Sequence, residues 1–216
     1  MTGEQARLRL PQKTAESRLI VVARAQRAED YDAVLEALID AGIRSVELTL
    51  TTPGTIERLP HLLERFAGDA DLGIGTVTSL DQLKSAVDAG ARYLVTPITV
   101  PELLAEAVRV GVPLVPGGFT PTELFASWSA GASAVKVFPA GRLGAGYVKD
   151  LRGPFPDIEV VPSGGVDLES AAQWLAAGAA AVSVGGPLLG DAFGGGDLDA
   201  LRERARGFVA VATGGA

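Results

Sequence analysis

Cysteine is absent from this sequence of 216 residues, histidine occurs once, and aromatic residues make up only 6% of the chain. Without cysteine there is no disulfide framework, no thiolate metal site and no cysteine nucleophile. The single histidine, His61, lies in a polar stretch, and no His/Asp/Glu cluster has the spacing of metal ligands. We therefore expect neither a bound metal nor another cofactor.

A surplus of positive charge and a long apolar run are missing as well. The formal net charge is −7, so the electrostatic field of the protein does not favour nucleic acid or an anionic membrane as a partner. No segment reads as a signal peptide or as a membrane span, which leads us to expect a cytoplasmic protein. Residues 1–16 are expected to form a polar tail or short helix, followed by one domain over 17–216.

What the chain does contain is a regular alternation of apolar runs and helical patterns. The predicted strands are 19–23, 45–50, 72–77, 93–96, 113–116, 134–138, 159–162 and 181–184. The predicted helices are 30–41, 54–66, 80–89, 101–110, 121–130, 145–151, 168–177 and 198–210. Eight strand–helix pairs in this length predict an α/β fold of the (β/α)8 TIM-barrel type, with an open doubly wound sheet as the alternative.

A weak internal repeat predicts which strand residues face the interior. Ala-Gly pairs end four of the helices, and a strand follows each pair directly. The fourth and sixth residues after each glycine are mostly large and apolar, as expected of residues that face the helices. Alternation along a strand turns the fifth residue to the opposite face. These fifth residues are Glu47, Val95, Lys136 and Ser183.

Burying a carboxylate and an amine inside one barrel would destabilise the fold, because each unpaired charge loses roughly several kcal/mol of solvation free energy. One interpretation is a structural ion pair between Glu47 and Lys136. The other, which we favour, is a reactive site, because a desolvated lysine can lose its proton and attack a ketone. If the pair were only structural, the lysine in Ala-Val-Lys-Val-Phe would interrupt the apolar pattern of a parallel strand without any gain in stability.

Small, hydroxylated or proline-fixed residues follow the predicted strands, where barrels carry their chemistry. The serine and glycines after the seventh strand, with the glycine pair after the eighth, match the phosphate cradle common in barrels. The candidate ligand-contacting residues at these ends are Arg24, Thr51, Thr76, Pro97, Phe138, Ser163, Gly164, Gly165, Gly185 and Gly186.

These motifs together resemble those of the 2-keto-3-deoxy-6-phosphogluconate (KDPG) aldolases, also known as 4-hydroxy-2-oxoglutarate (KHG) aldolases. The resemblance extends over about residues 19–208 and keeps the order and spacing of the motifs. It implies a metal-independent class I aldolase that cleaves a keto-deoxy sugar acid phosphate to pyruvate and an aldehyde. It also implies that the enzyme is a homotrimer.

The resemblance assigns roles to matching positions. Lys136 matches the Schiff-base lysine and Glu47 the general acid/base, whereas Thr76 matches a threonine that contacts the pyruvate part of the substrate. Pro97 and Phe138 match residues that line the same pocket. The phosphate loops of the family correspond here to Ser163, Gly164, Gly165, Gly185 and Gly186.

Arg24 matches an arginine of the first strand that faces the site in many family members. Three positions depart from the usual pattern: Thr51 replaces an arginine that helps to hold the substrate carboxylate, Ser163 replaces threonine, and Gly186 replaces serine. The choice among phosphogluconate-type, phosphogalactonate-type and unphosphorylated acids therefore stays open.

Two other functions remain compatible with a barrel that has two anion-binding loops. A phosphosugar epimerase or isomerase would use such loops but would need no interior lysine on its sixth strand. A non-catalytic barrel would bind a sugar phosphate without turning it over. Release of pyruvate without an added cofactor distinguishes the aldolase from both.

Overall fold

The computed structural model describes residues 7–214, in which parallel strands alternate with helices. The strands are β1 (Leu19–Ala23), β2 (Ser45–Thr49), β3 (Asp71–Gly75), β4 (Leu94–Val95), β5 (Leu114–Val115), β6 (Gly117–Gly118), β7 (Val135–Val137), β8 (Val160–Pro162) and β9 (Val182–Val184). The helices are α1 (Gln12–Ser17), α2 (Tyr31–Asp40), α3 (Thr55–Phe66), α4 (Leu80–Asp88), α5 (Pro101–Val110), α6 (Pro121–Ser129), α7 (Gly146–Arg152), α8 (Leu168–Ala176), α9 (Gly186–Leu189) and α10 (Leu198–Thr213). Short 3₁₀ turns are η1 (Ala28–Asp30), η2 (Ala140–Arg142) and η3 (Ala192–Gly194).

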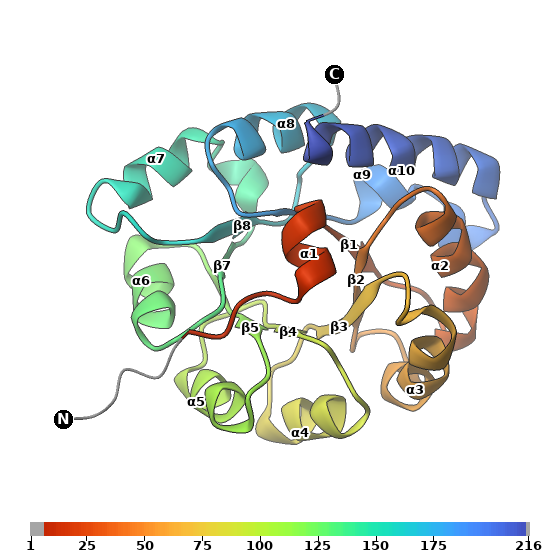
Figure 1. The fold of residues 1–216 in the computed structure, drawn as a ribbon, viewed down its shortest axis with the longest axis horizontal. Coiled ribbons are helices and arrows are strands. Elements are labelled where there is room, and N and C mark those ends of the chain that lie inside the picture. Colours follow the sequence, from red (N-terminus) through yellow and green to blue (C-terminus); the bar gives the residue numbers. More distant parts are fainter. Residues whose placement is uncertain (1–6, 215–216) are drawn as a thin grey trace.

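The sheet is parallel and curled, and the outer helices surround it (Figure 1). Six strands pair in the order β5-β4-β3-β2-β1-β9, and a second sheet contains β6-β7-β8. The prediction of one eight-stranded barrel is thus met only in part, as an α/β fold with a curled parallel sheet. The two sheets approach each other near β8 and β9. An isolated parallel β-bridge joins Ser163 and Ser183, and Ala180 N–H donates a hydrogen bond to Val160 C=O at 2.9 Å.

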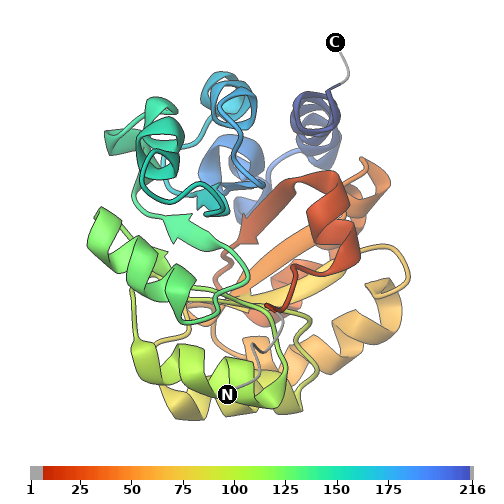
Figure 2. The same cartoon turned by 60° about the vertical axis from the view of Figure 1, so that its left-hand side comes forward.

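The predicted strand 113–116 extends further and is interrupted at Pro116. Before the proline, β5 pairs with β4; after it, Gly117 of β6 pairs with Lys136 of β7. Proline has no N–H to donate, so the ladder changes partner there. The Pro116 carbonyl still accepts from Lys136 N–H at 2.8 Å. This break separates the six-stranded sheet from the three-stranded one. The turned view in Figure 2 shows the strands at the centre with helices on the outside.

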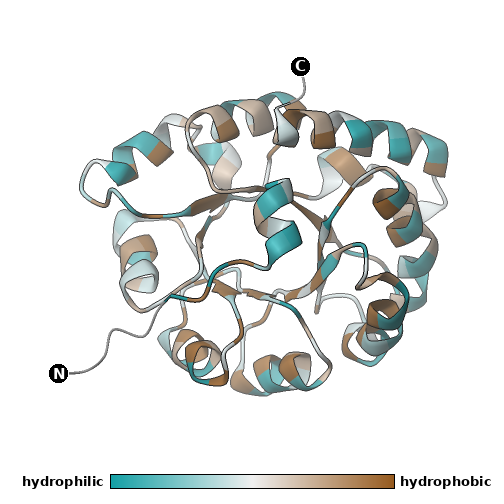
Figure 3. Cartoon of the chain, in the orientation of Figure 1, coloured by the Kyte–Doolittle hydropathy of each residue, from teal (hydrophilic) through white to brown (hydrophobic). Residues whose placement is uncertain are grey.

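The two faces of the strands bury different residues, as the register inferred from the Ala-Gly repeat predicts. The outward residues, among them Leu48, Val135 and Val184, belong to the large core between sheet and helices. A separate interior cluster comprises Ile20, Tyr93, Val95, Val115, Ala134, Val161 and Ala181. In Figure 3 the strands are mainly hydrophobic, whereas the outer helices carry both polar and apolar residues. Thr96, at another of these positions, is buried, and its hydroxyl accepts a hydrogen bond from Gly117 N–H at 3.2 Å.

The short helix α1 lies across the amino-terminal ends of the strands, at the centre of Figure 1. The Thr14 hydroxyl donates to Ser45 Oγ at 2.8 Å, and the Thr14 N–H donates to Asp71 at 2.8 Å. Ser45 is also 2.9 Å from the Tyr93 hydroxyl, which is fully buried. These bonds satisfy buried hydroxyl groups that would otherwise destabilise the fold. Through these bonds α1 covers the amino-terminal end of the sheet interior. Residues 1–6 of the predicted tail lie outside the described range.

None of the helices within residues 7–214 combines the length and hydrophobicity needed to cross a membrane. Most predicted helices begin and end within a few residues of the observed ones, and α5 agrees at both ends. Helix α9 is not predicted from the sequence. It is only four residues long, and its Gly-Pro start resembles a turn.

Candidate active site

A cavity of about 460 Å³ opens at the carboxyl ends of the strands. It contains every candidate ligand-contacting residue that the sequence predicts except Thr51, together with both interior ionisable residues. Its lining consists of Val22, Arg24, Glu47, Thr76, Pro97, Lys136, Phe138, Ser163, Gly164, Gly165, Gly185, Gly186, Pro187, Leu189, Gly190, Phe193 and Gly194.

Lys136 and Glu47 approach each other inside this cavity. Lys136 Nζ lies 3.7 Å from Glu47 Oε1, and the two side chains are only 8% and 2% exposed. The ammonium group also lies 5.5 Å from the centroid of the Phe138 ring, a contact that favours a cation. The second carboxylate oxygen, Glu47 Oε2, is buried and has no hydrogen-bond partner within residues 7–214. A buried carboxylate with one unpaired oxygen beside an amine is suited to exchanging protons with a ligand.

Small residues make room for this pair. Below it, the Tyr93 ring covers Gly73, where an added Cβ atom would come within 2.5 Å of the ring. Beside it, a Cβ atom on Gly75 would overlap the carboxylate of Glu47. The interior floor is thus filled by apolar side chains, whereas the next layer is left partly open by glycine.

The replacement Gly75→Ala is expected to displace the Glu47 carboxylate and to lower turnover by at least about tenfold, because catalytic groups tolerate little misplacement. Turnover and thermal melting should be measured together. Gly68→Ala is the control, since no atom lies within 4 Å of a Cβ atom at that position. Unchanged turnover in a folded Gly75→Ala protein would mean that the observed position of Glu47 does not matter.

The loops after β8 and β9 form the other side of the cavity. Gly164 and Gly165 have φ angles of 82° and 76°, a region that favours glycine, and their chain turns directly after Ser163. Ser163 is only 4% exposed, and its hydroxyl donates to Ser183 Oγ at 3.2 Å. Gly185 and Gly186 complete this side at the start of α9. These loops offer backbone groups to a ligand without large side chains in the way.

Other predicted residues lie around the mouth. Arg24 follows β1 and lies near Tyr31. Burial raises the pKa of Tyr31, and the positive charge of Arg24 partly offsets that rise. Thr76 follows β3 with a φ of 62°, an uncommon value for a residue other than glycine. Such backbone strain is often found at functional sites, so we regard Thr76 as a member of the site. Pro97 and Phe138 line the cavity after β4 and β7.

Thr51 is not brought into this group. It is exposed, and its hydroxyl lies 3.0 Å from that of Thr49. Of the residues described, Arg24 is therefore the only arginine in the lining.

The sequence reasoning also missed one wall of the cavity. No role is assigned from the sequence to the Gly-rich segment after α9, yet Gly190, Phe193 and Gly194 line the cavity. The Phe193 ring packs edge-on against the buried Tyr31 ring, with centroids 5.9 Å apart. The available signal was Phe193 itself, a lone aromatic residue among four glycines, because a large apolar side chain is stabilised by burial against the fold.

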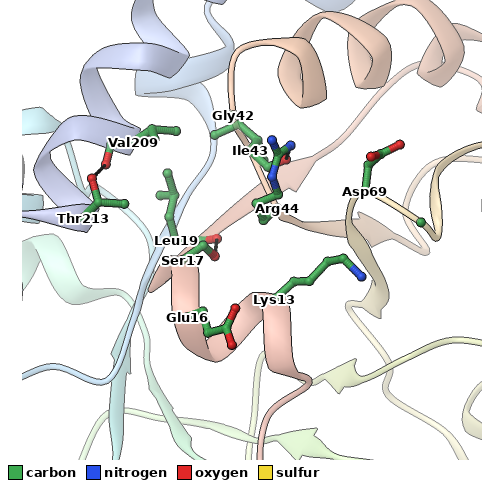
Figure 4. Close-up of a pocket in the computed structure, with 11 residues that line it drawn as sticks. Lys13, Glu16, Ser17, Leu19, Gly42, Ile43, Arg44, Asp69, Val209 and Thr213 are labelled. Atoms are coloured by element: carbon green, nitrogen blue, oxygen red, sulfur yellow. Dashed lines mark hydrogen bonds between the residues drawn. The ribbon is translucent and has the colours of Figure 1, made fainter.

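A second cavity of about 580 Å³ lies at the opposite, amino-terminal end of the strands (Figure 4). Lys13, Glu16, Arg44 and Asp69 supply its charged side chains, so positive and negative groups balance. Figure 4 shows these groups on α1 and on the loops before β2 and β3. This cavity contains neither Lys136 nor Glu47. This cavity, although larger than the one around Lys136, is therefore not the candidate active site. Within the described chain, no group of three His, Asp or Glu residues could hold a metal.

A buried lysine beside a carboxylate in an open cavity can form an imine with a ketone, and comparison with known proteins leads to enzymes that act on keto acids. A family profile described as "KDPG and KHG aldolase" matches residues 10–203. The 2-dehydro-3-deoxy-6-phosphogalactonate aldolase of Escherichia coli is 36% identical over 171 residues, which cover 79% of this chain and 83% of the relative. The 2-dehydro-3-deoxy-phosphogluconate aldolase of Treponema pallidum is 36% identical over 160 residues, covering 74% and 76%.

Among solved structures, the KDPG aldolase of Legionella pneumophila, with pyruvate captured as a covalent carbinolamine, is similar with a TM-score of 0.82. The two are 30% identical, and the match covers 90% of this chain and 95% of that one. The chain belongs to the KDPG and KHG aldolase family. It is accordingly an aldehyde-lyase of the class I type.

Proposed function

We propose that this enzyme cleaves a 2-keto-3-deoxy sugar acid phosphate to pyruvate and an aldehyde, with Lys136 as the Schiff-base residue and Glu47 as the general acid/base. The observation that carries the proposal is the pair itself. An amine and a carboxylate lie 3.7 Å apart, almost fully buried, at the inner end of the cavity. An ion pair that only filled the interior would have no need of an open cavity beside it.

The chemistry begins when Lys136, having passed a proton to Glu47, attacks the C2 ketone as a neutral amine. Glu47 returns this proton to the hydroxyl of the carbinolamine, which leaves as water, so that a protonated imine forms and Glu47 is again a carboxylate. Glu47 then takes the proton of the C4 hydroxyl, directly or through water. The C4–O bond becomes a carbonyl, the C3–C4 bond breaks, and its electron pair moves through C2 to the imine nitrogen as an enamine. Protonation at C3 and hydrolysis release pyruvate and restore the lysine.

The rest of the cavity supports an anionic substrate. We assign the phosphate end to the loops of Gly164, Gly165, Gly185 and Gly186, which offer backbone groups, with Ser163 at the start of the first loop. Arg24 supplies the one arginine near the keto acid among the lining residues, whereas Thr51 is too exposed to take the part of the family arginine. Thr76, Pro97 and Phe138 are assigned to the pyruvate part. Binding energy at the remote end would help to hold the reacting carbons in place.

The test is release of pyruvate in a coupled dehydrogenase assay, with no metal or cofactor added to the aldolase. Phosphogluconate-type and phosphogalactonate-type keto-deoxy acids, their unphosphorylated forms and 4-hydroxy-2-oxoglutarate form the panel. Both the gluconate and the galactonate types of aldolase occur among the relatives. We expect turnover with at least one phosphorylated acid and weaker turnover without phosphate. Saturable binding without any pyruvate release would favour a non-catalytic barrel.

Four further features belong to the proposal. A closed (β/α)8 barrel is supported by the bridge between Ser163 and Ser183, which joins the two sheets. Residues 17–216 would form one domain, with α1 packed on it. A homotrimer and a cytoplasmic location are proposed from the resemblance to the family. Light scattering on the eluted protein tests the trimer.

A further inference from the structure

Ser183 lies in β9, next to the cavity but not in its lining. Its side chain faces the interior, is only 2% exposed, and accepts the hydroxyl proton of Ser163 at 3.2 Å. The two serines also form the backbone bridge between β8 and β9. Ser163, in contrast, belongs to the cavity wall. Ser183 is therefore placed behind a residue that a ligand would touch.

This bond decides what Ser163 can offer to a ligand. A serine hydroxyl has one proton to donate and two lone pairs to accept with. Since the proton is directed to Ser183, only lone pairs remain for the cavity. Ser163 is thus suited to accept a hydrogen bond from a ligand hydroxyl, and poorly suited to donate one to a phosphate or a carboxylate.

The position of Ser163 relative to Lys136 indicates which part of a bound substrate would carry the donating hydroxyl. Lys136 pairs with Val161 across β7 and β8, and Ser163, which directly follows β8, is the next residue on that side of the chain and lines the cavity one step nearer the mouth. The Ser163 N–H donates to Val137 C=O at 3.0 Å, which fixes this step. A chain attached to Lys136 through C2 and extending toward the mouth would bring its hydroxylated carbons beside Ser163.

We propose that Ser183 is a positioning residue that orients Ser163 to accept a hydrogen bond from a hydroxyl of the keto-deoxy acid. The inference rests on the proposed function and adds a determinant for the hydroxylated part of the substrate. Pyruvate alone has no such hydroxyl. The reaction of pyruvate with Lys136 therefore does not depend on Ser183, whereas cleavage of the complete substrate does.

The experiment compares two reactions of each variant. One is exchange of the pyruvate methyl protons for deuterium, which needs the Schiff base and a base but no substrate hydroxyl. The other is cleavage of the best substrate in the panel. Ser183→Ala is expected to lower kcat/KM for cleavage on the order of tenfold, the value of one well-placed hydrogen bond. Exchange should stay within about twofold, as for independent sites.

A double-mutant cycle tests whether Ser183 affects cleavage through Ser163. If Ser183 acts through Ser163, adding Ser183→Ala to Ser163→Ala changes cleavage no further. The matched control is Ser127→Ala, which removes another buried serine hydroxyl, on α6 and outside the cavity. It should leave both reactions unchanged.

Three results would overturn the inference: equal losses in exchange and cleavage, unchanged cleavage in Ser183→Ala, or additive losses in the double variant. The first would mean that the bond between the serines only supports the fold. Absence of exchange in the unsubstituted protein is a different failure, because it would contradict the proposed function itself.

Discussion

Lys136→Met is expected to abolish turnover, with a loss of at least about a thousandfold, as for removal of other covalent nucleophiles. Methionine has a similar length and suits the buried strand, but it has no nitrogen with which to form an imine. The Glu47 carboxylate would lose its partner at 3.7 Å. Cleavage of the panel substrates and formation of a pyruvate adduct should both be measured.

The matched control for this variant is Lys84→Met, which removes an exposed lysine on α4. That protein should keep its activity. A folded Lys136→Met protein that still released pyruvate at a comparable rate would show that another group forms the intermediate, and the assignment of the site would be wrong.

Glu47→Gln is expected to lower kcat by about a hundredfold to ten-thousandfold, the range for loss of a general acid/base. Glutamine keeps the shape of the side chain but cannot take the proton of the C4 hydroxyl. Pyruvate binding should change much less, because neither the cavity nor Lys136 is removed. Steady-state kinetics and pyruvate titration give the two values.

Glu203→Gln, at an exposed position of α10, is the control and should behave as the unsubstituted protein does. An equal effect of Glu47→Gln on pyruvate affinity and on turnover would contradict the role of Glu47 in proton transfer. It would indicate that the carboxylate mainly holds the lysine in place.

The central pair of this site could be predicted from the sequence because strand alternation is strict. The glycines that end the helices fix the start of the following strand, so Glu47 and Lys136 could be assigned to one face. The interior position of Val95 follows from the same reasoning and agrees with the structure. Loop glycines could be assigned to the cavity because the carboxyl ends of parallel strands share one edge.

Features that depend on contacts distant in sequence could not be predicted. Phe193 lines the cavity only because Tyr31, far earlier in the chain, supports its ring. Thr51 follows its strand as the family pattern suggests, but the local turn leaves it exposed. The division of the sheet at Pro116 also depends on which neighbours the strand pairs with, which periodicity does not reveal.

The most direct measurement is borohydride reduction in the presence of pyruvate, followed by mass spectrometry of the digested protein. A Schiff base between pyruvate and a lysine is reduced to a stable secondary amine on that lysine. We predict one adduct, on the peptide that contains Lys136, and none in the Lys136→Met variant. An unmodified protein, or an adduct only on exposed lysines such as Lys84, would contradict the account.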